Sequence, residues 1–432
     1  MRKYVEPDRQ QWASLTRRVE RDDAMLEWRV AGILEQIRRG GDLALRQVSE
    51  AIEGFPLAEM KVSREEIETA SGLVPDQLKD AIREAAARIR AFHELEMPRD
   101  TEWDDGAGTV CRRRFLPIRR VGLYIPGGTA PLFSTVLMLG VPSSIAGCRE
   151  RVMFTPPSKE GSVAPAILFA ASLCGITEIY KIGGAQAVAT MAYGTESIAK
   201  VDKIFGPGNR FVTKAKQLVN KEGVATDMPA GPSEVLVIAD ESADVSFVAS
   251  DLLSQAEHGP DSQVVLLSDS VTFARNVLRE IERQKESLPR KMIAEASLAE
   301  SRVIVMKDLE ECVEFANLYA PEHLILAVED PETLAAKVEA AGSVFLGNYS
   351  PESAGDYASG TNHILPTGGT AVAWNGLGVE SFLHAITFQS LSREGLTAIG
   401  ETIATMADAE MLAAHANAVR LRVGKETLKN NN

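Results

Sequence analysis

Apolar positions divide the chain into a helical start and a longer region of alternating strands and helices. Up to about residue 95, apolar residues recur at helical spacing among charged ones, most clearly in Met25–Ile37 and Leu78–Phe92, with a break at Gly40-Gly41. From about Gly122, short apolar runs alternate with helical segments. This alternation is typical of a parallel sheet with crossover helices, so the sequence predicts an α/β fold.

The first set of alternating segments reads as a βαβαβ unit with strands at 152–155, 178–182 and 203–205. Ligands of such sheets lie beyond the carboxyl ends of the strands, where Tyr124–Gly128, Gly183–Gln186 and Gly206–Asn209 fall. Gly206-Pro-Gly-Asn209 imitates the GxGxxG dinucleotide fingerprint but lacks its third glycine and its acidic residue. Tight packing turns are an equally good explanation of these glycines.

A second set of strands is predicted at 235–239, 264–267, 302–306, 324–328 and 344–346. The helix between the first two has Asp244 as a plausible N-cap and ends at about His258, with Gly259 suited to a left-handed position. Gln255 and His258 stand three residues apart and would project from one face. They resemble half of a metal site, although a solvated helix end explains them as well.

Polar side chains elsewhere suggest further chemistry. Glu322 and His323 precede a predicted strand and could share acid–base work, unless they are a surface pair in a turn. The loop from Ser350 to His363 combines small residues with Glu352, Asp356 and His363, and Asp356 is a candidate ligand.

The remaining histidines are assigned from their local surroundings. We expect His93 to be solvated on a charged helix and His384 to be structural within a helix. A single long helical run is predicted from Ile399 to Val423, with Glu410 and His415 among small residues.

Charge and cysteine content narrow the function class. A net charge of −14 without a basic stripe argues against nucleic acid or an anionic membrane as partner. The start of the chain has no apolar signal region, so we expect a cytoplasmic location. The four cysteines have no CxxC spacing, so a metal would need nitrogen and oxygen ligands.

Eight stretches, in this order, resemble the histidinol dehydrogenase family over nearly the whole chain. They are VGLYIPGG at 121–128, KIGGAQ at 181–186, FGPGN at 205–209, DMPAGPSE at 227–234, SQAEHGPD at 254–261, APEH at 320–323, SPESAGDYASGTN at 350–362 and AHANAV at 414–419. The first hundred residues match only loosely.

The resemblance implies residue roles. Zinc would be bound by Gln255, His258, Asp356 and His415, and Glu322 and His323 would be the acid–base pair. NAD would contact Tyr124, Gln186 and Asn209. The substrate L-histidinol would lie among Ser233, Gln255, His258, His323, Asp356, Glu410 and His415. The implied reaction oxidises L-histidinol through the aldehyde to L-histidine with two NAD, the last step of histidine biosynthesis.

The resemblance also implies two Rossmann-like parallel-sheet domains and a homodimer with shared active sites, because the C-terminal helical tail is exchanged between subunits. We expect a helical N-terminal extension at 1–20, a first α/β domain at 21–125 and 234–376, a second at 126–233 and a tail at 377–432. Two alternatives remain: a related dehydrogenase of another small polar alcohol, such as a sulfonated diol, and a zinc hydrolase that uses Glu322.

Overall fold

The computed structural model describes residues 1–18, 24–56, 59–127, 131–229 and 231–424. The chain divides into unit 1, Met1–Glu96 with Ile118–Phe382, and unit 2, Met97–Pro117 with Leu383–Asn432. Unit 1 contains two parallel sheets and unit 2 one antiparallel sheet. The predicted α/β class with two parallel sheets is therefore confirmed. No helix among the described residues is long and apolar enough to cross a membrane.

The larger sheet of unit 1 has the strand order β1-β11-β10-β9-β12-β13, and all its neighbouring strands run parallel. Its strands are β1 (Arg2–Val5), β9 (Glu234–Ala239), β10 (Gln263–Ser268), β11 (Arg302–Val305), β12 (His323–Ala327) and β13 (Ser343–Leu346). Every residue of β9, β10 and β12 is buried, which explains why these strands read as continuous apolar runs.

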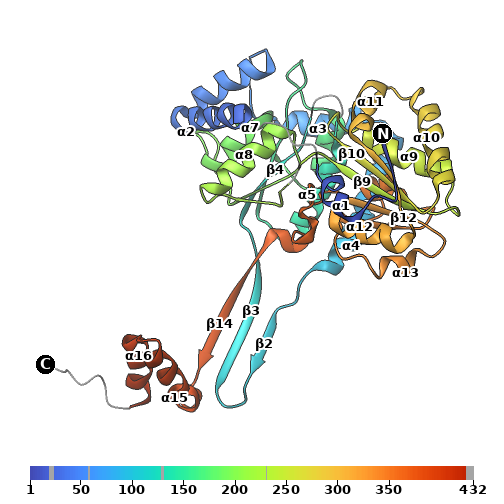
Figure 1. Ribbon diagram of the computed structural model, residues 1–432. Coiled ribbons are helices and arrows are strands. Elements are labelled where there is room, and N and C mark those ends of the chain that lie inside the picture. Colours follow the sequence, from blue (N-terminus) through green and yellow to red (C-terminus); the bar gives the residue numbers. More distant parts are fainter. Residues whose placement is uncertain (19–23, 57–58, 128–130, 230, 425–432) are drawn as a thin grey trace. The chain divides into compact units, whose positions relative to one another are not determined.

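Helices cover both faces of this sheet (Figure 1). One face carries α9 (Val245–Ala256), α10 (Val271–Lys285) and α11 (Lys291–Glu300). The other face carries α1 (Arg9–Leu15), α12 (Leu309–Tyr319) and α13 (Pro331–Ala335). The prediction of a purely helical extension at 1–20 is wrong for Arg2–Val5, because this segment pairs with β11 as an edge strand.

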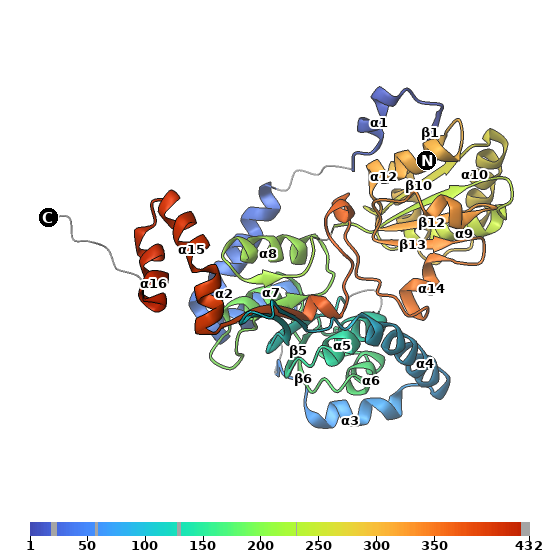
Figure 2. The same ribbon diagram turned by 90° about the horizontal axis from the view of Figure 1, so that it is seen from below.

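The second sheet of unit 1 has the order β6-β5-β4-β7-β8. Its strands are β4 (Arg120–Tyr124), β5 (Glu150–Phe154), β6 (Glu178–Tyr180), β7 (Lys203–Phe205) and β8 (Ala225–Thr226). One face packs against α2 (Ala24–Glu53), α7 (Gly184–Tyr193) and α8 (Arg210–Lys221). Figure 2 shows α3 (Arg64–Leu73), α4 (Asp76–His93), α5 (Phe133–Ile145) and α6 (Pro165–Leu173) gathered on the other side. Gly41 interrupts α2 at a φ of 53°, as its glycine pair predicts.

Four short helices complete unit 1. They are α14 (Glu352–Tyr357) and the 3₁₀ turns η1 (Glu94–Glu96), η2 (Thr370–Val372) and η3 (Val379–Phe382). The α14 helix lies in the segment that the sequence predicts as a loop, and it contacts α9.

Unit 2 is a three-stranded antiparallel sheet followed by two helices. Strand β3 (Thr109–Pro117) pairs with β2 (Thr101–Asp104) and with β14 (Leu383–Leu391), and α15 (Arg393–Ala409) packs on α16 (Ala413–Val423). The long helix predicted up to Val423 is therefore two helices, and the chain reverses between them at Met411 with a φ of 60°. The buried core between these helices includes Ala404, Ala407 and Ala416.

A buried ion pair fastens the turn that follows β7. Lys216 and Asp227 form this pair at less than 10% exposure. The Lys216 ammonium also donates to the Gly206 carbonyl at 2.8 Å, and the Gly206 amide donates to the Asp227 carboxylate at 2.6 Å. A Cβ at Gly206 would lie 2.1 Å from the Tyr124 carbonyl oxygen, so this glycine is required for packing between β7 and β4. The packing explanation of that glycine is correct.

Lys216→Met should destabilise the protein by about 3–5 kcal/mol, because it leaves the buried Asp227 carboxylate without its cation. Arg283→Met, which removes a solvent-screened surface pair with Glu280, should destabilise the protein far less. Urea unfolding followed by fluorescence and circular dichroism measures both effects. Equal effects of the two substitutions would contradict the assignment of Lys216.

Candidate active site

Both parallel sheets reverse their strand order beside one cavity. In the six-stranded sheet β10 and β12 flank β9, and in the five-stranded sheet β5 and β7 flank β4. The cavity has a volume of about 760 Å³, and its lining includes Gly208, Asn209, Phe211, Ser233, Glu234 and His258. Since β7 ends at Phe205 and β9 begins at Glu234, the cavity lies at the carboxyl edge of one sheet and the amino edge of the other.

His323, the first residue of β12, is a buried base with a defined proton position. Its Nδ1 lies 3.1 Å from the carbonyl oxygen of Glu234. A carbonyl can only accept, so Nδ1 carries the proton and Nε2 keeps its lone pair. The Nε2 atom lies 3.8 Å from Oδ1 of Asp356. Burial lowers the pKa of His323 to about 4, so the imidazole is neutral at pH 7 and ready to accept a proton.

Glu322 is a buried carboxyl beside this imidazole. Its Oε2 accepts a hydrogen bond from the Glu234 amide at 2.7 Å and lies 3.7 Å from Nδ1 of His323. Burial, together with the charges of Glu234 and Asp356, raises the pKa of Glu322 well above its usual range. The pair is therefore buried rather than in a surface turn, and burial favours the neutral form of both side chains.

Three side chains next to this pair could hold a divalent cation. His258, Glu352 and Asp356 each offer a ligand atom, and these atoms lie within 4.8 Å of one another. Gln255 is fully buried on α9, and neither Oε1 nor Nε2 of its amide has a hydrogen-bond partner among the described residues. An unsatisfied buried amide is costly, so these atoms are suited to coordinate a bound ion.

Glu352 is a residue of this site for which the sequence predicted no role. It is 1% exposed, and its Oε1 lies 3.9 Å from Nδ1 of His323. Burial and the neighbouring carboxylates of Asp356, Glu322 and Asp251 raise its pKa well above its usual range. The signal was its spacing of four residues from Asp356, which places both side chains on one face once the segment is helical.

The helix that carries Gln255 ends slightly earlier than predicted. Asp244 caps it by accepting from the Ser246 amide at 2.7 Å, as expected. The helix closes at Ala256 with Glu257 as C-cap, so His258 lies just beyond it. Gly259 is not among the residues with positive φ, and the predicted left-handed cap there is wrong.

The three residues assigned to NAD lie at the carboxyl edge of the five-stranded sheet. Tyr124 ends β4, Gln186 lies in the first turn of α7 after β6, and Asn209 caps α8 after β7. Tyr124 accepts from the Gly184 amide at 3.1 Å. The buried side-chain amide of Gln186 has no partner among the described residues.

Two histidines differ from their predicted settings. His93 is fully buried rather than solvated, with Nδ1 2.8 Å from the Ile89 carbonyl. His384 lies exposed on strand β14 of unit 2 rather than in a helix. Glu410 and His415 also belong to unit 2, whereas Gln255, His258 and Asp356 belong to unit 1.

The cysteines fit a packing role. Cys148, Cys174 and Cys312 are buried, and burial raises the pKa of Cys148 to about 11 and that of Cys174 to about 12. Thiols of this kind are poor nucleophiles.

Two parallel sheets that share a cavity, with a buried carboxyl–imidazole pair on Glu322 and His323 next to the cavity residue Glu234, are typical of an α/β enzyme. A sequence model of the histidinol dehydrogenase family matches residues 16–423. Histidinol dehydrogenases of Xylella fastidiosa and Bacteroides fragilis are 54% and 52% identical to this chain, covering 91% and 96% of it and 92% and 97% of their own lengths. A crystal structure of histidinol dehydrogenase from Elizabethkingia anophelis matches with a TM-score of 0.95 and 49% identity over 98% of both chains. The chain belongs to the histidinol dehydrogenase family, whose members are NAD-dependent oxidoreductases of histidine biosynthesis.

Asp356→Asn should weaken the binding of a divalent cation at least about 10-fold, because it replaces a carboxylate ligand with a neutral amide. Competition with a chromophoric chelator, with zinc as the probe, measures the affinity. His384→Asn, which changes an exposed histidine on unit 2, should leave the affinity unchanged. If the Asp356→Asn protein binds zinc with native affinity, Asp356 is not a ligand of the cation.

Proposed function

We propose that this chain oxidises L-histidinol through L-histidinaldehyde to L-histidine while reducing two NAD, as the last step of histidine biosynthesis. The observation that carries the proposal is the buried His323–Glu322 pair, which the backbone of Glu234 holds beside the cavity that Asn209 and His258 line. The relatives named histidinol dehydrogenase support the choice of substrate.

Zinc would be held by Gln255, His258 and Asp356 from unit 1 and by His415. The partnerless amide of Gln255 and the convergence of His258 with Asp356 fit such a nitrogen and oxygen ligand set. Glu352 would be an acidic neighbour of the ion. Bound zinc supplies a Lewis acid that holds the substrate's amino and imidazole nitrogens, and NAD supplies the hydride acceptor.

His323 would act as the base of the first oxidation. Its Nε2 would take the hydroxyl proton while the carbinol carbon gives up a hydride, which yields the aldehyde. The hydrogen bond from Nδ1 to Glu234 supports this assignment, because it keeps the lone pair on Nε2.

Glu322 would serve the second oxidation. Water adds to the aldehyde carbonyl, the carboxylate of Glu322 takes a proton from that water, and loss of a second hydride leaves the carboxylic acid. The position of Glu322 supports this role, because its Oε2 is held by the Glu234 amide and lies 3.7 Å from Nδ1 of His323. No cysteine nucleophile is required.

The other proposed contacts are assigned by family resemblance. NAD would contact Tyr124, Gln186 and Asn209. The substrate would contact Ser233, Gln255, His258, His323, Asp356, Glu410 and His415. Ser233, His258 and Asn209 line the cavity, which supports their part of this set.

We also propose a homodimer in which Glu410 and His415 complete the partner's site. Unit 2 supports this because it exposes large apolar side chains that a partner could cover. They include Trp103, Phe388, Met406, Met411 and Leu421, each more than 40% exposed in the single chain.

The native protein with zinc should form two NADH for each L-histidinol. Glu322→Gln should slow oxidation of L-histidinaldehyde by about 10²- to 10⁴-fold, and slow its formation from L-histidinol less, because only the second step needs an activated water. NADH absorbance measures both rates. A zinc-loaded native protein that reduces no NAD with L-histidinol would overturn the proposal, and reduction with other small alcohols alone would favour the related dehydrogenase.

Sites shared between subunits should allow two inactive variants to complement each other. Mixing Glu322→Ala with His415→Ala subunits should restore part of the activity, since one site of the mixed dimer would then hold a native Glu322 and a native His415. As a matched control, Glu410→Ala mixed with His415→Ala should restore none, because every site would lack one tail residue. If subunits exchange and the first mixture stays inactive, the tail does not cross.

A further inference from the structure

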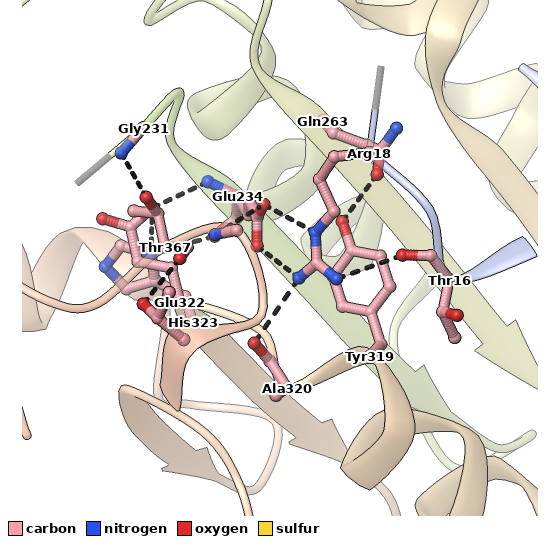
Figure 3. A network of polar contacts seen from close by, with 12 residues as sticks. Thr16, Arg18, Gly231, Glu234, Gln263, Tyr319, Ala320, Glu322, His323 and Thr367 are labelled. Carbon is pink, nitrogen blue, oxygen red and sulfur yellow. Dashed lines mark hydrogen bonds and ion pairs between the residues drawn. The ribbon is translucent and has the colours of Figure 1, made fainter. Parts of the chain in front are cut away.

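Glu234 joins both members of the acid–base pair through its backbone. Its amide donates to Oε2 of Glu322 at 2.7 Å, and its carbonyl accepts from Nδ1 of His323 at 3.1 Å (Figure 3). Any displacement of this peptide segment would therefore move the carboxyl of Glu322. It would also break the hydrogen bond that keeps the proton of His323 on Nδ1. The segment opens β9, and the side chain of Glu234 is 3% exposed.

The side chain of Glu234 is held by Arg18, from the segment that follows α1. Nε of Arg18 lies 2.8 Å from Oε1 of Glu234, and Nη2 lies 2.7 Å from Oε2. The Gly368 amide donates to the same Oε1 at 3.1 Å. A two-pronged guanidinium–carboxylate contact fixes orientation as well as distance, which a lysine cannot do.

The same guanidinium also contacts the residues that precede β12. It lies 3.6 Å from the centre of the Tyr319 ring, and its Nη2 is 3.4 Å from the Ala320 carbonyl. Tyr319 is anchored in turn by a 2.7 Å hydrogen bond from its hydroxyl to Gln263. Ala320 has a φ of 48°, a left-handed conformation that an alanine adopts only under constraint. Ala320 lies two residues before Glu322 along the chain.

We propose that Arg18 is a positioning residue for the acid–base pair. Arg18 holds the first residue of β9 through Glu234 and the segment before β12 through Tyr319 and Ala320. It thereby fixes the position of the Glu322 carboxyl and the tautomer of His323. This inference rests on the proposed roles of Glu322 and His323. Arg18 also lines the cavity, but its guanidinium is already engaged by Glu234, Tyr319, Ala320 and the Thr16 carbonyl. It therefore acts through its neighbours rather than on a ligand.

Steady-state kinetics separates positioning from ligand binding. Arg18→Met should lower kcat for L-histidinol by about 10- to 100-fold, the cost of misplacing a catalytic group, with KM for L-histidinol and NAD within about 3-fold of native. Arg18→Lys keeps the positive charge but loses the two-pronged contact with Glu234, so its kcat should lie between those of the native protein and Arg18→Met. Glu234→Gln should lower kcat in the same direction. A higher KM at native kcat would overturn the proposal, because it would place Arg18 on a ligand.

Arg9→Met is the matched control. Arg9 also links the N-terminal segment to α12, through an ion pair with Glu314, and its guanidinium lies over Trp12 of its own helix α1. It is exposed and does not contact Glu234. It should retain native kcat. If Arg9→Met lowers kcat as much as Arg18→Met, Arg18 only anchors the N-terminal segment and the proposal fails.

Histidine ¹⁵N resonances provide a readout that needs no substrate. The chain has six histidines, so the His323 signals can be assigned with a His323→Asn protein. Native His323 should show a protonated Nδ1 and a bare Nε2, and Arg18→Lys and Glu234→Gln should shift these signals toward a mixture of tautomers. Unchanged signals in both variants would overturn the proposal. If these shifts occur but the native protein does not oxidise L-histidinol, the positioning role stands and the proposed substrate fails.

Discussion

The hydrogen bonds that the Glu234 backbone donates to Glu322 and accepts from His323 are the constraint on which the site depends. A buried carboxyl and a buried imidazole would each lose solvation, and only fixed dipoles in the right places compensate for that loss. One peptide segment supplies both a donor and an acceptor here. Because β9 and β12 are parallel neighbours with Val235 opposite His323, the sheet register itself sets these distances.

The two parallel sheets contribute opposite edges to one cavity. The turn after β7 is at the carboxyl edge of its sheet, in accordance with the usual rule for ligands in α/β folds. Glu234 and His323 instead begin their strands, so the proposed acid–base pair lies at an amino edge. Helix α9 connects the carboxyl end of β9 to the amino end of β10. Gln255 and His258, at and just beyond the end of this helix, therefore lie at the same edge of the sheet as Glu234 and His323.

Features set by local sequence were predicted well. Buried parallel strands are short apolar runs, so β5, β7, β9, β10 and β12 fall where the pattern placed them, and Asp244 caps its helix as expected. Some errors are local, such as the left-handed cap predicted at Gly259 and the missed break at Met411, and others concern long-range contacts. His93 stands among charged residues in the sequence, yet its ring is buried and lies 3.4 Å from Asn362, 269 residues further along the chain. Glu352 gained significance only once α14 was known to be a helix.

Strand β14 shows where sequence patterns stop being informative. Leu383 and Ile386 stand at a helical spacing, but the segment is extended because it pairs with Thr109–Pro117, more than 260 residues earlier in the chain. All of its residues except Leu383 are exposed, so no buried face leaves an alternating pattern to read. A strand that exposes Ile386 and Phe388 to solvent gains little from hydrophobic burial within one chain. Its conformation therefore depends on main-chain pairing with β3, and its apolar side chains are left available to a partner.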